Sequence, residues 1–136
     1  IDYLITYIAL RKLRMSERLR LRVEFPPELN ELNIYPLLFL PLVENAFKYV
    51  GGDYQLDIIM KWENNRISLF IRNSIPELSA EDEALRKSVD ERQRKGIGLV
   101  NLRRRLSLLY PSKHRLETRK EETEFVAELM IEIEEI

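Results

Sequence analysis

Three polar side chains of complementary chemistry lie close together in the first half of the chain. Glu44, Asn45 and Lys48 bring a carboxylate, a carboxamide and an amine onto one helical stretch, where positions i, i+3 and i+4 share a side. A carboxamide oxygen suits Mg²⁺, which binds phosphates and several waters at the same time. A lysine can meet a phosphate as a point charge, and a glutamate can orient a water or accept a proton. The spacing therefore favours a magnesium–nucleotide site.

The alternative for this segment is a solvent-facing Glu44–Lys48 pair at i, i+4 beside an incidental asparagine. Taken alone, the spacing favours that alternative. However, Asn45 interrupts a run of apolar residues, which puts it close to the buried face of the helix, and a buried amide needs hydrogen-bond partners. The apolar neighbours are Leu42, Val43, Ala46 and Phe47.

A second candidate is the turn Gly96-Ile97-Gly98, which opens a basic helical segment. Glycines let a backbone approach a phosphate, and the first N–H groups of a helix attract anions. Asn101 stands where the dinucleotide-binding fingerprint has its third glycine, and no strand leads in, so that kind of site is disfavoured. The alternative is a flexible loop before an ordinary helix whose arginines face solvent.

The composition bounds the class of protein. The chain has 136 residues, 45% hydrophobic and 33% charged, which indicates one soluble globular domain. A net charge of -1 gives no reason to expect nucleic-acid binding, and without cysteine there is no disulfide framework. No apolar run reaches the roughly 18 residues of a membrane span. Because Ile1 stands inside an apolar pattern without an initiator methionine, we expect a piece of a longer protein.

Hydrophobic periodicity predicts the elements that must position these residues. We expect a helix over 1–19, a strand over 21–25, and a helix that starts near Asn33 or Pro36 and runs through Phe47, with a kink or a late start at Pro41. The later elements are strands over 54–62 and 66–72 joined by an Asn64-Asn65 turn, a long loop over 76–95, a helix over 97–110, and strands over 114–119 and 123–133. This order predicts an α+β fold: a mixed or antiparallel sheet with helices on one face.

The two segments together resemble the ATP-binding domain of sensor histidine kinases, and more narrowly the LytS-type family. The first segment, Pro41 to Tyr49, matches that family's box P-L-V-E-N-A-x-K-H, with Tyr49 in place of the usual histidine. The second matches G-I-G-L-x-N-x-x-x-R-L through Gly96, Ile97, Gly98, Leu99, Asn101, Arg105 and Leu106. The resemblance covers nearly the whole chain.

The resemblance implies a two-layer α/β sandwich of the histidine-kinase ATPase (Bergerat) type that clamps ATP between a helix layer and a flexible lid at about 76–95. It makes Asn45 the Mg²⁺ ligand and places Glu44, the catalytic candidate, and Lys48 near the phosphates, with Tyr49 beside them. Gly96 and Gly98 would shape the lid hinge, and Leu99, Asn101 and Arg105 would line the nucleotide. Residues 1–20 would end an upstream helix, and 21–136 would form the catalytic domain.

Two places depart from the family pattern. Asp-x-Gly-x-Gly, whose aspartate meets the adenine amino group, here reads Asn73-Ser74-Ile75-Pro76-Glu77, so Asn73 can offer an acceptor oxygen but the glycines are gone. A late Gly-Thr is reduced to Thr123 after Glu122. These departures leave open a second hypothesis, a non-catalytic interaction module of the same fold. A related serine kinase or ATPase of the superfamily is a third.

The resemblance also implies partners that lie outside this chain. The γ-phosphate would pass to a histidine on an upstream phosphoacceptor and dimerisation domain, and then to an aspartate of a response regulator. The parent would be a homodimer anchored in the inner membrane, with this domain in the cytoplasm. The sole histidine, His114, lies past the last predicted helix in no phosphoacceptor motif, and we expect it at the surface.

Overall fold

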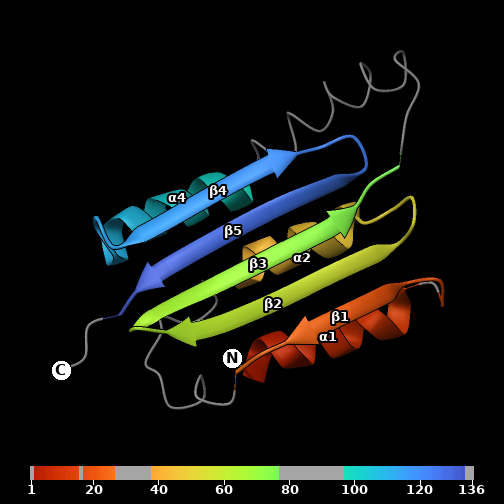
Figure 1. Ribbon diagram of the computed structural model, residues 1–136, viewed down its shortest axis with the longest axis horizontal. Coiled ribbons are helices and arrows are strands. Elements are labelled where there is room, and N and C mark those ends of the chain that lie inside the picture. Colours follow the sequence, from red (N-terminus) through yellow and green to blue (C-terminus); the bar gives the residue numbers. More distant parts are fainter. Residues whose placement is uncertain (1, 16, 27–37, 77–96, 134–136) are drawn as a thin grey trace.

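A computed structural model describes residues 2–15, 17–26, 38–76 and 97–133 of the chain. Figure 1 shows two layers, a twisted sheet with helices on one of its faces. In chain order the elements are α1 (Asp2–Arg14), β1 (Arg20–Glu24), α2 (Leu40–Tyr49), β2 (Gln55–Glu63), β3 (Arg66–Ser74), α4 (Ile97–Leu109), β4 (His114–Lys120) and β5 (Glu124–Glu132). The predicted α+β sandwich is confirmed, whereas the boundary placed at residue 20 stays a prediction.

The sheet is mixed, one of the two arrangements that the element order allowed. Its strands lie in the order β1-β2-β3-β5-β4, with β1 parallel to β2 and every other neighbouring pair antiparallel. The parallel pair follows from the connection, because α2 crosses over between β1 and β2. The β2–β3 hairpin turns at Asn64-Asn65, as predicted, and both residues have positive φ angles of 52° and 61°.

The core lies between the helices and the sheet. Alternate residues of the strands point to the helix side, where β2, β3 and β5 each contribute an apolar row and β4 contributes Leu116. These rows pack against the buried sides of the helices, and the largest fully buried side chains include Phe39, Phe47, Leu4, Leu38, Ile58, Leu69, Leu102 and Leu106. This packing fixes where α2 and α4, the two chemically interesting helices, sit over the sheet.

The start of α2 corrects one expectation. The helix begins at Leu40, whereas Leu38 and Phe39 form a bend, so the expected run of helix through Leu38 is wrong. The predicted late start at Pro41 is confirmed, because Pro41 lies in the first turn of α2. Proline has no backbone N–H and clashes with the preceding turn, so it fits only in the first helical turn. Residues 33–37 lie outside the described residues, as do Gly96 and, apart from Pro76, the predicted lid.

The second face of the sheet carries an ion pair whose carboxylate is buried. No helix among the described residues covers this face, which is turned to the viewer in Figure 1. On it Asp57 is only 3% exposed, and Arg72 of the neighbouring strand donates to Asp57 Oδ2 from Nη2 at 2.5 Å and from Nε at 3.0 Å. Beside this pair lies a hollow whose lining includes Ile59, Phe70 and Met130.

Candidate functional site

The predicted site helix α2 has three kinds of surface. Its sheet-facing side buries Leu42, Val43, Ala46 and Phe47. Glu44 and Lys48 are exposed on the opposite side, whereas Asn45 and Tyr49 lie half-buried along one flank. Asn45 and Phe47 are two positions apart, roughly 200° around the helix, and therefore occupy opposite flanks. The helix thus separates residues that adjoin in sequence.

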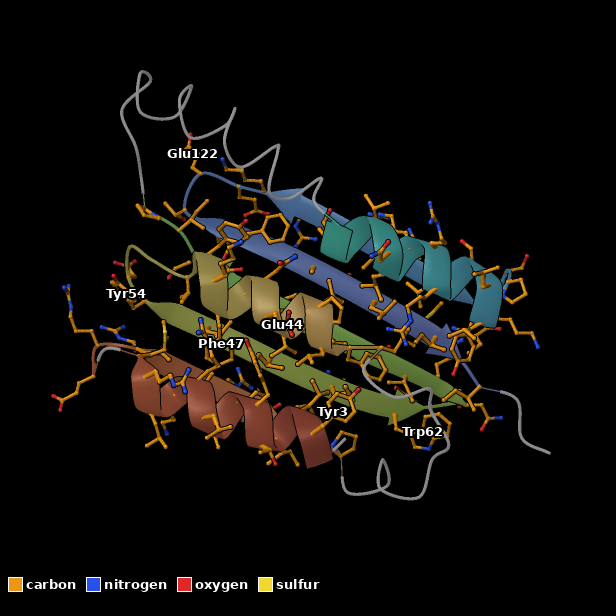
Figure 2. The ribbon with its side chains drawn as sticks, turned by 180° about the vertical axis from the view of Figure 1, so that it is seen from behind. Tyr3, Glu44, Phe47, Tyr54, Trp62 and Glu122 are labelled. Atoms are coloured by element: carbon orange, nitrogen blue, oxygen red, sulfur yellow. The ribbon has the colours of Figure 1, made fainter. Side chains whose placement is uncertain are left out.

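The Phe47 flank is closed by α1. The ring of Tyr7 meets the ring of Phe47 edge-on with centroids 6.1 Å apart, and the Arg11 guanidinium lies 5.7 Å from the centre of the same ring. Figure 2 shows Phe47 between the two helices. Burial raises the pKa of the Tyr7 phenol, with Arg11 opposing the rise and the negative charge of Glu44 adding to it. Glu44 therefore acts electrostatically on α1, on the same side of α2 as Phe47.

The Asn45 flank faces the other way, toward α4. Figure 2 shows α2 between α1 and α4, and α2 contacts both of them. The Lys48 ammonium lies 5.4 Å from the centre of the Tyr49 ring, so its charge is held toward the same flank as Asn45. The structure thus groups Asn45, Lys48 and Tyr49, and it turns Glu44 partly away from them toward α1.

The other predicted nucleotide contacts gather at one end of the sheet. Figure 1 shows that β3 ends there, beside the α2–β2 loop and the β4–β5 turn. Asn73 is 1% exposed, faces the helices in register with Leu56 and Phe125, and donates from its amide to the Ser74 carbonyl at 3.4 Å. The Thr123 carbonyl accepts from Ile75 N at 2.9 Å, and the Thr123 side chain is exposed.

A clamp that sequence reasoning missed ties the α2–β2 loop to the end of β3. The Ser74 hydroxyl donates to the Gly51 carbonyl at 2.7 Å and accepts from Gln55 N at 2.8 Å, while Gly51 N donates to the Ser74 carbonyl at 2.8 Å. Gly52 has φ +59°, and a Cβ there would lie 2.7 Å from the Ile75 carbonyl oxygen. Glycines on the α2–β2 loop therefore allow this loop to approach the end of β3 closely.

The helix that follows the glycine turn, α4, carries the remaining predicted nucleotide contacts that the structure describes. Gly98 lies in the first turn of α4, Leu99 packs against the core, Asn101 is exposed and Arg105 is half-buried. Leu102 and Leu106 anchor the helix in the core, as the apolar spacing predicted. Farther along the chain, His114 Nδ1 lies 2.8 Å from the Tyr110 carbonyl oxygen. His114 is half-buried, rather than at the surface as the sequence predicted, and its exclusion as the phosphoacceptor stays a prediction.

The donor set suits a magnesium nucleotide better than a bare metal ion. Within the described part of the chain, no group of three or more His, Asp or Glu side chains could hold a metal. The Asn45 flank of α2, which we call the open flank, offers instead the carboxamide of Asn45 and the ammonium of Lys48. The buried amide of Asn73 lies at the end of β3. A carboxamide and a lysine are partners for an ion that also binds phosphate oxygens.

Solved structures share this arrangement of helices and sheet. The chain superposes on the histidine kinase AdeS of Acinetobacter baumannii with a TM-score of 0.58 at 14% identity, covering 96% of this chain and 61% of that one. It superposes on the mycobacterial sensor histidine kinase MprB with a TM-score of 0.57 at 13% identity, covering 96% of this chain and 92% of that one. On the nucleotide-free catalytic domain of histidine kinase ThkA the TM-score is 0.56 at 16% identity, covering 96% of this chain and 87% of that one. The fold is that of a histidine kinase catalytic domain.

Sequence comparison leads to the same class of protein. The chain is 27% identical over 121 residues to the sensor protein kinase HptS of Staphylococcus aureus, which covers 85% of this chain and 23% of that kinase. No model of a known protein family matches the chain. The predicted relationship to sensor histidine kinases is confirmed, and the LytS subtype stays a prediction. Among the described helices, none is long and apolar enough to cross a membrane.

Proposed function

We propose that this chain is the ATP-binding catalytic domain of a LytS-type sensor histidine kinase. In this role it binds Mg-ATP and donates the γ-phosphate to a histidine on a separate phosphoacceptor and dimerisation domain. A response regulator then receives the phosphate on an aspartate. The parent protein is a homodimer anchored in the membrane, with this domain on the cytoplasmic side.

The observation that carries the proposal is the division of α2 into a closed and an open flank. α1 covers Phe47, whereas Asn45 and Tyr49 lie on the flank toward α4 and the exposed Lys48 reaches the Tyr49 ring. That open flank leads to the end of the sheet, where Asn73 lies in the last part of β3 and Ile75 N donates to the Thr123 carbonyl. A helix supported on one flank and polar on the other presents its amide and its ammonium on a rigid base.

Each residue then has a role that its position allows. Asn45 holds the Mg²⁺ ion through its amide oxygen, and Lys48 binds phosphate oxygens. Bound Mg²⁺ neutralises charge on the phosphates, and the protein's main task in phosphoryl transfer is to position groups and to stabilise charge. Asn73 offers its amide oxygen to the adenine amino group. Glu44, exposed on the outer side of α2 and turned partly toward α1, orients the incoming acceptor or takes up its proton.

The alternative is a non-catalytic interaction module with the same fold. It is favoured by Ile75, which is 9% exposed and takes a position that the family gives to glycine. A buried isoleucine there narrows the space beside Asn73. Under this alternative the chain folds normally and does not bind nucleotide.

Calorimetric titration of ATP and of ADP into the chain, with Mg²⁺ and with EDTA, decides between the two functions. The kinase proposal expects binding that Mg²⁺ strengthens. It also expects Lys48→Ala to weaken that binding, while Lys61→Ala, an exposed lysine on the far face of the sheet, leaves it unchanged. No binding in a folded sample would overturn the proposal in favour of the interaction module. Finding a phosphorylatable histidine upstream in the parent would exclude the serine kinase or ATPase.

A further inference from the structure

The outer side of α1 is apolar although nothing in the described structure covers it. Leu4 and Ile8 on the inner side are buried in the core, yet Ile5, Leu10 and Leu13 are 49%, 55% and 83% exposed. Six large apolar side chains of the described residues are exposed, and three of them lie on this one helix. A helix that is apolar on both sides is typical of one that packs between two partners.

The exposed row points away from the rest of the domain. Ile5, Ala9 and Leu13 follow one another at i, i+4 and i+8 and therefore form one ridge. Ala9 is two positions from both Tyr7 and Arg11, the residues that contact α2, so the ridge lies roughly 200° around the helix from that contact. Figure 2 shows α1 as the outermost helix of its layer. A further helix could extend the layer at this edge.

The ridge matches itself when it is reversed. With Ala9 at the centre, Ile5 and Leu13 stand four positions to either side, so an antiparallel copy places each isoleucine beside a leucine of the partner. The small side chain at the centre lets two helices approach to the lower end of the usual range of about 8–10 Å. A surface that is complementary to itself is the requirement for a two-fold interface.

The charges of α1 select the antiparallel orientation. Arg11, Lys12 and Arg14 occupy the last turn, and the single acidic residue of the helix, Asp2, occupies the first. A parallel pair would bring both basic turns together. An antiparallel pair separates them and puts the basic turn of each copy alongside the acidic first turn of the other, which also opposes the two helix dipoles. The charge distribution thus favours an antiparallel second copy of this helix over a parallel one.

We propose that the outer side of α1 is a contact surface for a second copy of this chain, with two α1 helices packed antiparallel about an axis close to Ala9. This contact is separate from the nucleotide flank of α2 and does not depend on the proposed kinase activity. A buried ridge of three residues per copy forms a small interface, which suits domains that a longer protein already holds together.

Disulfide trapping tests the contact directly because the chain has no cysteine of its own. Under mild oxidation Ala9→Cys should form covalent dimers at least about tenfold faster than Leu108→Cys, an exposed control on α4, since only the first places two Cβ atoms within disulfide reach. A mixture of Ile5→Cys and Leu13→Cys should form mixed dimers faster than either variant links to itself.

Two results would overturn the proposal. The first is that Ala9→Cys forms covalent dimers no faster than the Leu108→Cys control, which would mean that the ridge binds a different partner. The second is faster self-linking of Ile5→Cys and of Leu13→Cys than of their mixture, which would mean a parallel pair. A separate measurement without oxidant, sedimentation equilibrium of Leu13→Glu against Leu108→Glu, should show weaker self-association only for Leu13→Glu.

Discussion

The two flanks of α2 come from the same ten-residue helix and have opposite surroundings. On one flank Phe47 is 2% exposed beneath Tyr7 and Arg11 of α1. On the other, the half-buried Asn45 lies beside Lys48 and Tyr49 and faces α4. The closed flank fixes the position of the helix, and the open flank carries the groups that can bind a ligand. Stability and binding should therefore be separable by mutations two residues apart.

The largest expected effect is on the closed flank. Phe47→Ala should lower the free energy of unfolding by about 3–5 kcal/mol, because it removes a buried aromatic ring and leaves a cavity beside Tyr7. Urea unfolding measures the loss, and Val100→Ala, 48% exposed on α4, is the matched control with an expected change within about 0.5 kcal/mol. A loss for Phe47→Ala no larger than that of the control would mean that α1 does not support this flank.

The next effect is on the open flank and concerns binding. Asn45→Ala should weaken Mg²⁺-dependent ATP affinity by at least about tenfold, as expected for the loss of a contact to a charged group worth about 1.5–3 kcal/mol. Its stability should change little, because Asn45 is only half-buried. Calorimetry of Asn45→Ala beside Glu44→Gln sharpens the comparison, since the Glu44 variant should keep its affinity. Unchanged affinity in Asn45→Ala would remove this residue from the site.

A smaller effect is expected where the open flank meets the end of β3. Gly52→Ala should destabilise the domain by about 1–2 kcal/mol, because the residue has a left-handed φ of +59° and its new Cβ would press on the Ile75 carbonyl. Asp53→Ala, exposed in the same loop, is the control. Thermal unfolding compares the two variants, and equal stabilities would show that the loop relaxes away from β3 without loss.

The smallest effect is electrostatic and belongs again to the closed flank. Burial raises the folded-state pKa of Tyr7 above the unfolded value of about 10. The stability that follows is therefore complete below a pH of about 10 and is lost as pH rises through the raised folded value. The absorbance titration curve of the unsubstituted chain minus that of Tyr7→Phe should show one phenol that ionises above pH 10. A difference curve centred at the ordinary value would mean that α1 does not bury the Tyr7 ring.

Much of the fold follows from local pattern. Alternation in β2, β3 and β5 predicted their positions to within about two residues, and the strand rows bury the residues on the expected side. The start of α2 was less predictable, because the apolar run continues back through Leu37 and only Pro41 marks the first turn. A proline fits a first turn or breaks a helix, and spacing alone does not distinguish these outcomes.

The site was predictable in its residues and not in their grouping. Spacing brought Glu44, Asn45 and Lys48 together on one helix, but which flank α1 covers depends on packing between segments far apart in the chain. The Ser74 clamp was hidden for the same reason, since its partners Gly51, in the α2–β2 loop, and Gln55, at the start of β2, are far from it in the chain. The Gly51-Gly52 pair was the available signal, because adjacent glycines often mark a close approach of two backbones.

The Asp57–Arg72 pair on the uncovered face has a consequence for how the strands align. Side chains alternate along a strand, so a slip of one residue in β2 would turn Asp57 into the apolar layer, turn Leu56 and Ile58 out of it, and leave Arg72 without Asp57. An unpaired carboxylate among apolar side chains is strongly unfavourable, whereas the pair itself adds little net stability. Asp57 therefore helps to set the alignment of the two strands: it makes a hairpin of β2 and β3 that is mispaired by one residue less stable than the native one.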